Sequence, residues 1–209
     1  MTTEPQTSPP QTKDDGASGK STSSFGRFFT FAVVGFILTT VLVFYVAGQV
    51  TPTAEKTFEI TPQAKPLPSG EFQLTIDARN NGFWVPINLS LGKEVQTEEQ
   101  ADILVKRYFL RAPKGAMNLG QTALEEAVVP KEAQWVKDAK YKGQLQNEAL
   151  ANWYQYSSMT HVLKVNKRTN AVKLKSGGVA FFEILSYYCK PEGSGCLTLR
   201  YRLQHDDAS

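Results

Sequence analysis

The sequence predicts an all-β domain tethered by one N-terminal transmembrane helix, and three features of the chain indicate this. Short alternating apolar runs, separated by turn residues, fill the region 71–204, which has the size of one ordinary domain. An uncharged apolar run occupies 28–48. A long polar stretch, 113–152, interrupts the strand pattern and has the character of a loop insertion. We therefore expect an antiparallel β domain with a C-terminal meander and a long loop.

The N-terminal segments predict a tail followed by a membrane span. Residues 1–27 are rich in Thr, Ser, Pro, Gln and Gly, a composition typical of a disordered tail. The run 28–48 contains about twenty-one uncharged residues, enough for a helix to cross the hydrocarbon core of a bilayer. A soluble core helix would carry a polar stripe, and a cleaved signal peptide would have a shorter leader and a shorter apolar run. The sequence favours a transmembrane helix over both.

Charges on either side of the apolar run predict its orientation. Lys20 and Arg27 precede it, whereas Glu55 and Lys56 cancel each other after it. By the positive-inside rule the N-terminus lies in the cytoplasm. We expect a single-pass protein of the inner (cytoplasmic) membrane, with the bulk of the chain periplasmic or extracellular.

The segments that flank the β domain differ from it in composition. Residues 49–70 include four prolines and predict a stiff, extended spacer. Residues 205–209 are expected to form a short C-terminal tail. The net charge of the whole chain is only +3, and no basic patch is interleaved with aromatic residues. Nucleic acid is therefore not an expected partner. Membrane lipid is an expected partner because of the apolar run 28–48.

The strand pattern is densest at the two ends of the predicted domain. The first end carries "FQLTIDA", "FWVPINLSL" and "ILVKRYFLRA", each predicted as one strand, with Pro86 marking an edge or a bulge. The final third carries "HVLKVN", "AVKLK", "VAFFEILSYY" and "CLTLRYRL", separated by turn clusters of hairpin length. These four predict an antiparallel meander. In the loop between the two ends we expect only short helical turns, near 122–127 and 148–153.

Cys189 and Cys196, the only two cysteines, flank the turn "KPEGSG" between two predicted strands. Positions that face each other at the mouth of a hairpin suit a disulfide. A redox pair would usually be a tighter C-x-x-C motif at a helix N-terminus, and a zinc site would need two further ligands. Outside the cytoplasm a structural disulfide is the expected outcome.

The residues that usually perform catalysis are scarce. The chain has two histidines and lacks a G-x-S-x-G motif, a glycine-rich phosphate loop and an H-E-x-x-H motif. Glu125 and Glu126 are adjacent, so they cannot face one substrate as an acid–base pair. We do not expect an enzyme.

The order of several motifs resembles the HmuY-like haem-binding protein family over most of 75–203. The resemblance lies in "IDARNNGFWVPINLSLGKEV", in "ADILVKRYFLRAPKGA", and in "NWYQYSSMTHVLKVN" followed by the meander that ends in "TLRYRL". It implies an all-β fold and capture of haem by two axial side chains, His or Met, from loops at one end of the sheet.

That resemblance implies haem as the cofactor and Met117, Met159 and His161 as its binding residues, with Met117 and His161 on the iron. Imidazole and thioether groups are both competent iron ligands. A framework role for His161 and a core-filling role for Met117 are the competing interpretations. If "SSMTHVL" is extended, Met159 and His161 share a face, and if it turns at Thr160 only one of them can reach a ligand.

Two functions of different classes follow. The first is a membrane-anchored, extracytoplasmic protein that binds or handles haem. The second is a non-catalytic accessory subunit of a larger membrane complex, in which the helix packs on other subunits through Gly35 and its threonines and the β domain docks on a partner. A redox carrier that uses Cys189 and Cys196 is the least favoured.

Overall fold

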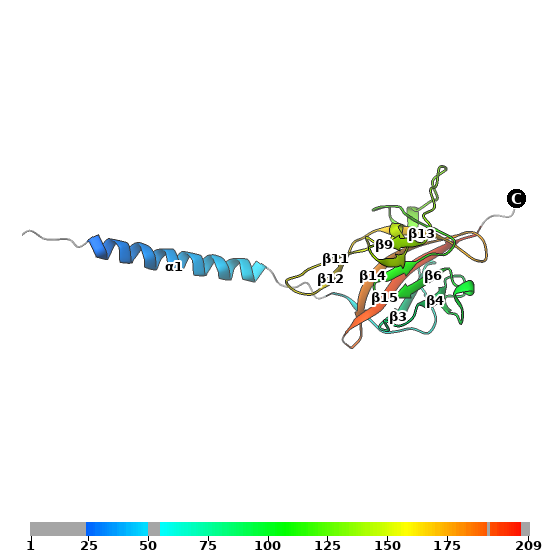
Figure 1. Cartoon of the computed structure of the whole chain (residues 1–209), viewed down its shortest axis with the longest axis horizontal. Helices are drawn as coiled ribbons and strands as arrows, with labels where there is room; N and C mark the ends of the chain where they lie inside the picture. The colour runs from blue at the N-terminus through cyan, green and yellow to red at the C-terminus, as the bar shows by residue number, and fades with distance from the viewer. Residues whose placement is uncertain (1–23, 50–54, 192, 206–209) are drawn as a thin grey trace, which may run out of the picture. The chain divides into compact units, whose positions relative to one another are not determined.

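The computed structural model describes residues 24–49, 55–191 and 193–205. The chain divides into two units, one ending at residue 53 and the other beginning at residue 54. The first unit contains one helix and the second contains all the strands (Figure 1).

Parts of three predicted segments lie outside the described residues. They are residues 1–23 of the predicted tail, residues 50–54 of the predicted spacer and residues 206–209 of the predicted C-terminal tail.

The helix α1 (Ser24–Gln49) confirms the helical state predicted for 28–48. Its described side chains, from 30 to 45, are exposed or nearly so, and Phe36 has 73% of its surface exposed. The hydroxyls of Thr39 and Thr40 donate to the carbonyl of Phe36, so both polar groups are satisfied within the helix. Among the described residues, no helical stretch has the length and apolarity of a membrane span. Insertion of α1 in a membrane therefore stays a prediction.

The second unit is built on two antiparallel sheets and two separate hairpins, which confirms the predicted antiparallel β fold. The larger sheet has the order β2-β3-β15-β14-β13-β8, with β1 pairing in parallel on β14, and the smaller sheet has the order β5-β4-β6-β7. β14 and β15 are the long strands of the larger sheet (Figure 1). The strands of the larger sheet are β1 (Thr57–Phe58), β2 (Lys65–Pro66), β3 (Phe72–Asp77), β8 (Ala116–Asn118), β13 (Thr169–Lys173), β14 (Val179–Cys189) and β15 (Ser194–Gln204).

The smaller elements complete the unit. The smaller sheet consists of β4 (Val85–Asn88), β5 (Lys93–Glu94), β6 (Ile103–Lys106) and β7 (Phe109–Arg111). The hairpins are β9 (Ala139–Tyr141) with β10 (Gln144–Gln146), and β11 (Tyr154–Tyr156) with β12 (Leu163–Val165). Single turns of 3-10 helix are η1 (Glu98–Gln100), η2 (Leu124–Glu126) and η3 (Glu148–Leu150). η2 and η3 confirm the two short helical turns expected in the long loop.

The predicted four-stranded meander is wrong in its first strand. β13, β14 and β15 form a three-stranded meander, whereas "HVLKVN" supplies β12, which pairs with β11 in its own hairpin. Only a short loop separates β11 from β12, so the local pairing closes at a lower entropic cost than a pairing with the main sheet.

The run "ILVKRYFLRA" is also two strands rather than one. β6 and β7 pair around a two-residue turn made by Arg107 and Tyr108, with Lys106 facing Phe109. Arg107 has a φ of 54°, in the region that such turns require and that Gly or Asn usually occupies. Because neither residue type is present, no turn could be predicted here from the sequence.

Two further expectations need correction. Pro86 lies inside β4, which has neighbours on both sides, so it marks neither an edge strand nor a bulge. The described part of the predicted spacer packs on the sheet, because β1 pairs with β14, β2 pairs with β3, and Ala64 donates to the carbonyl of Gly92. The β unit therefore starts well before residue 71.

The main core lies between the two sheets. β14 alternates between two apolar clusters, because Phe182 belongs to the main core and its neighbour Phe181 belongs to a second cluster on the other face. A strand covered on both faces reads as the continuous apolar run seen in the sequence. The second cluster is formed by Met117, Leu124, Ala127, Ala171 and Phe181.

Asp102 joins the two sheets through its carboxylate. It is 1% exposed and accepts hydrogen bonds from the backbone N–H of Leu89 (2.7 Å), which follows β4, and of Lys175 (2.6 Å), in the turn between β13 and β14. Burial raises the pKa of the Asp102 carboxyl, and these N–H donors oppose that shift. One side chain therefore fixes a loop of the smaller sheet against a turn of the larger one.

We predict that Asp102→Ala destabilises the protein by about 3 kcal/mol, because it leaves two backbone N–H groups without their acceptor. Chemical denaturation of the full chain measures the change. Asp77→Ala is the matched control, since its carboxylate is 40% exposed and pairs only with Arg79 on the surface. An equal loss in the two variants would contradict the role given to Asp102.

The predicted disulfide between Cys189 and Cys196 is present, with the two Cα atoms 5.1 Å apart. It closes the turn between the two longest strands of the sheet.

Replacing both cysteines by Ser should lower the free energy of unfolding by about 2 kcal/mol, because the loop released is short. Thermal unfolding with and without reductant measures this. A reductant effect that persists in the double variant would show that the loss comes from elsewhere.

Candidate functional site

A cavity of about 440 Å³ opens in the β unit where the β6–β7 turn, the β11–β12 hairpin and the end of β14 meet. Its lining is dominated by aromatic side chains. It is lined by Arg107, Tyr108, Tyr154, Tyr156, His161, Leu163, Tyr187, Tyr188 and Ser194. Five of the eight tyrosines of the chain are on this wall, so their clustering reflects the fold rather than composition.

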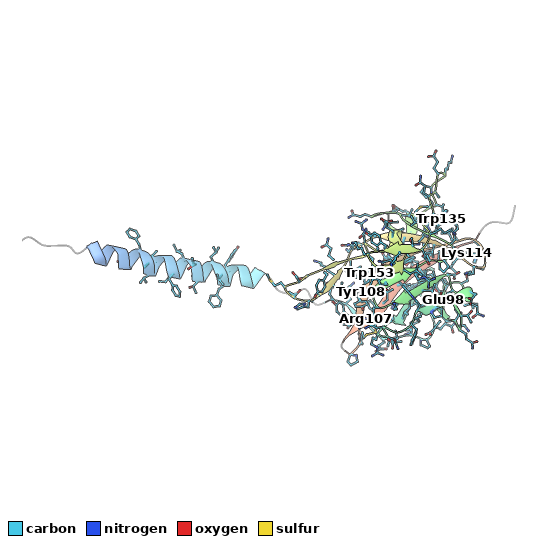
Figure 2. All side chains as sticks on the ribbon, viewed as in Figure 1. Glu98, Arg107, Tyr108, Lys114, Trp135 and Trp153 are labelled. Atoms are coloured by element: carbon cyan, nitrogen blue, oxygen red, sulfur yellow. A yellow bond between two sulfur atoms is a disulfide. The ribbon has the colours of Figure 1, made fainter. Side chains whose placement is uncertain are left out.

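The β6–β7 turn forms one rim and is fixed by two backbone contacts. The N–H of Arg107 donates to the carbonyl of Ala78 (3.0 Å), and the indole N–H of Trp153 donates to the carbonyl of Tyr108 (3.0 Å). Figure 2 shows Arg107, Tyr108 and Trp153 gathered in one part of the β unit, apart from Trp135. Hydrogen bonds therefore fix the backbone of both turn residues that line the cavity, Arg107 and Tyr108.

Aromatic contacts set the inner wall. Trp153 is 2% exposed, and its ring lies 4.8 Å from that of Tyr154 and 5.8 Å from that of Tyr187. The ring of Tyr108 packs edge-on against Tyr154 at 5.7 Å. Each such pair adds about 1 kcal/mol beyond its buried area, so contacts within the protein stabilise this arrangement of rings.

The opposite rim is the loop between β11 and β12, which turns back on itself. Ser157 donates to the carbonyl of Val162 (2.9 Å), and the N–H of His161 donates to the carbonyl of Ser157 (2.8 Å). His161 has a φ of 56°. The loop therefore turns near Thr160, the case in which only one of the two candidate ligands can face a site.

His161 is the candidate that lines the cavity. Its Nδ1 lies 2.6 Å from the hydroxyl of Tyr156, which leaves Nε2 as the nitrogen without this contact. When Nδ1–H donates to the tyrosine oxygen, Nε2 carries the lone pair and is competent to bind a metal. Met159, two residues earlier, is 86% exposed and does not line the cavity.

Met117 lies elsewhere in the β unit. It is in β8, opposite Ala171 of β13, and is 8% exposed within the second apolar cluster. It is not among the residues that line the cavity. The structure therefore does not bring Met117 and His161 together around this cavity, and Met117 has the packing environment of a core methionine.

Three of the cavity tyrosines have hydroxyls that are harder to ionise than in water. Burial raises the pKa of Tyr154, Tyr187 and Tyr188. Tyr188 accepts a hydrogen bond from the N–H of Leu163 (2.7 Å), whereas the buried hydroxyl of Tyr187 has no hydrogen-bond partner among the described residues. A buried hydroxyl in that state is suited to a polar atom of a ligand.

The side chains of the cavity offer aromatic faces, one imidazole and one cation. Among the described residues, no group of three or more His, Cys, Asp or Glu side chains could hold a metal ion. The cavity offers instead tyrosine rings for stacking, one imidazole and one guanidinium. Sequence reasoning found His161 but missed the tyrosines and Arg107. The closely spaced tyrosines of "WYQY" and "SYY" were the available signal.

Comparisons with known proteins identify the fold. No model of a protein family matches the sequence, and no curated protein matches it. Among solved structures, the apo HmuY analog TFO of Tannerella forsythia is 17% identical, with a TM-score of 0.56 over 65% of this chain and 96% of that one. A protein of Bacteroides vulgatus described as HmuY-like and heme binding is 21% identical, with a TM-score of 0.55 over 69% and 97%. Apo PinO of Porphyromonas gingivitis is 16% identical, with a TM-score of 0.53 over 68% and 98%.

The β unit has the HmuY-like fold. This confirms the resemblance seen in the sequence motifs, at the level of the fold. The match takes in nearly the whole length of each HmuY-like structure. The site residues of this chain must be argued from its own cavity.

Proposed function

We propose that this protein binds haem in the tyrosine-lined cavity and holds it outside the cytoplasm without catalysing a reaction. The observation that carries the proposal is the placement of His161. It is the imidazole on the rim of an aromatic cavity, with Nδ1 engaged by Tyr156. When Nδ1 carries the proton of that contact, Nε2 is the nitrogen that can bind a metal.

The residues of the cavity fit such a group. Tyrosine rings offer flat apolar faces to a porphyrin, His161 offers one axial nitrogen and Arg107 offers a cation to carboxylate side chains. A bound haem would supply the iron and its redox and ligand-binding chemistry. The chain supplies binding and orientation, and the buried wall of Trp153, Tyr154 and Tyr187 shields one side from water.

The fold supports the same proposal. One of the solved structures with this fold is described as heme binding. Because the identities are 21% or lower, the likeness supports a haem-type ligand and does not assign its residues. Met117 is no longer proposed as a second axial ligand, since it is buried away from the cavity.

We further propose that α1 anchors the β unit to the inner membrane. The proposal rests on the sequence: no charged residue occurs between 28 and 48, and about twenty-one residues at helical rise cover roughly 30 Å. Lys20 and Arg27 precede this run, which favours a cytoplasmic N-terminus. The β unit then lies in the periplasm or outside the cell, where the Cys189–Cys196 disulfide is stable.

We predict that the full chain in detergent binds haemin with a saturable Soret change, and that His161→Ala abolishes or shifts the band. Loss of the imidazole removes the nitrogen ligand and leaves the aromatic wall intact. An absorbance titration measures both effects. Met159→Ala is the matched control, because it changes an exposed side chain of the same loop.

Met117→Ala serves as a second control. It should lower stability through loss of core packing and leave the Soret band in place. Absence of saturable binding, or equal spectra for the wild type and His161→Ala, would contradict haem binding at this cavity. Subunits that co-purify from the native membrane without a Soret band would favour the accessory-subunit function instead.

We predict that the full chain stays in the membrane fraction after alkaline carbonate extraction. Replacing Leu38 and Leu42 by Arg should release it, because charged side chains at the centre of a bilayer are costly. The same two positions changed to Ala provide the control, since the helix then stays uncharged. Release of the wild-type chain by carbonate would refute the anchor.

A further inference from the structure

We infer that Arg107 and Tyr187 form a carboxylate-binding corner of the cavity, so that the ligand is recognised through an acidic group as well as through its ring. This inference rests on the proposed function and deepens it. It names the chemical feature that decides which ring compounds the cavity accepts.

Arg107 has neither an acidic partner nor the backbone carbonyls that take up the guanidinium of Arg202, which donates to Leu124 and Ala127. Arg79 pairs with Asp77, Arg111 pairs with Glu98 and Asp138, and Arg200 pairs with three glutamates. Among the described residues, no carboxylate lies within ion-pair distance of Arg107. Its guanidinium is half-buried at the cavity wall, where an unpaired charge is less well solvated than on an open surface.

The lining of the cavity has no internal anion to neutralise this charge. It consists of one arginine, five tyrosines, one histidine, one leucine and one serine. None of these side chains is acidic, and the buried tyrosines remain protonated. The cavity is therefore positive and rich in donors, which favours an anionic ligand.

Tyr187 supplies an independent observation. Its side chain is 2% exposed, and its hydroxyl has no hydrogen-bond partner among the described residues. Arg107 and Tyr187 line the same cavity. Burial raises the pKa of Tyr187, and the charge of Arg107 together with a side-chain contact from it opposes that rise. A carboxylate placed between them would satisfy both the guanidinium and the buried hydroxyl.

The backbone holds this corner in place before a ligand arrives. Arg107 is in a two-residue turn, and its N–H donates to the carbonyl of Ala78. Tyr187 is in β14, the strand between β15 and β13 at the centre of the larger sheet. Donors on anchored elements lose little freedom on binding, so their contacts contribute strongly to affinity. Lysine at position 107 would keep the charge but lose the planar fork that binds both carboxylate oxygens.

The test compares metal-free deuteroporphyrin with its dimethyl ester, using the full chain in one detergent and porphyrin fluorescence as the readout. The free acid should bind about tenfold more tightly than the ester, and Arg107→Gln should reduce this ratio to near one. Lys106→Gln is the matched control: it removes a neighbouring charge, and its amine lies over Trp84 (5.0 Å), outside the cavity lining. Tyr187→Phe should lower the ratio in part.

The outcomes separate this inference from haem binding. Equal affinity for acid and ester, or the same ratio in Arg107→Gln and Lys106→Gln, overturns the carboxylate corner even if His161 controls the haemin spectrum. A ratio that depends on Arg107, with a haemin spectrum independent of His161, upholds the corner and overturns axial ligation. Failure of both metal-free porphyrins to bind overturns the corner, whereas the haemin titration alone decides axial ligation, because only haemin carries the iron.

Discussion

The buried carboxylate of Asp102 is the contact on which the arrangement of the two sheets depends. It binds one backbone group from each sheet, at Leu89 and at Lys175, and it lies 1% exposed at the start of β6. The carbonyl of the same Leu89 accepts the hydroxyl of Tyr201, which burial keeps protonated by raising its pKa to about 12. Both polar groups of Leu89 are thus satisfied within the core. The apolar side chains around Asp102 then pack on a carboxylate whose two oxygens each accept a backbone N–H.

The cavity is a second consequence of the same arrangement. β6 begins beside Asp102 and ends at the turn that carries Arg107 and Tyr108, so a fixed small sheet gives a fixed rim. Trp153 connects that rim to the hairpin that follows it in sequence, through its bond to the carbonyl of Tyr108 and its contact with Tyr154. The site is therefore assembled by hydrogen bonds and ring contacts between residues that are far apart in the sequence.

The sequence was most informative where local pattern and tertiary role agree. The alternation in "FQLTIDA" predicts β3, and the cysteines that flank "KPEGSG" predict the disulfide, because both signals arise within one hairpin or strand. Sequence-based prediction failed at the Arg107–Tyr108 turn. Arg107 has a positive φ there, a backbone conformation that an arginine in the sequence does not indicate. Prediction also failed for 55–70, because prolines that stiffen a linker equally suit short edge strands such as β2.

The candidate site shows the same limit. His161 could be singled out because histidine is rare in this chain and has distinctive chemistry. Met117 was chosen on similar grounds, yet its alternation with Ala116 in β8 points it into the second cluster, which only strand pairing with β13 reveals. The tyrosine wall joins three separate segments, so no single stretch of sequence contains it.

The β11–β12 hairpin gives the cavity a wall whose strand pairing is separate from that of the main sheet, although Leu163 of β12 packs in the main core. It forms a two-stranded sheet of its own, and the bond from Leu163 to the Tyr188 hydroxyl ties it to β14. Swinging this hairpin outward leaves every ladder hydrogen bond of the larger sheet intact. Ligand exchange then requires only a local opening, whose free energy is a fraction of that of global unfolding. Under the proposed function, the residence time of a ligand would depend on the few contacts that hold this hairpin, chiefly the packing of Leu163 and its bond to Tyr188, whereas the stability of the fold depends on the pairing of the two sheets.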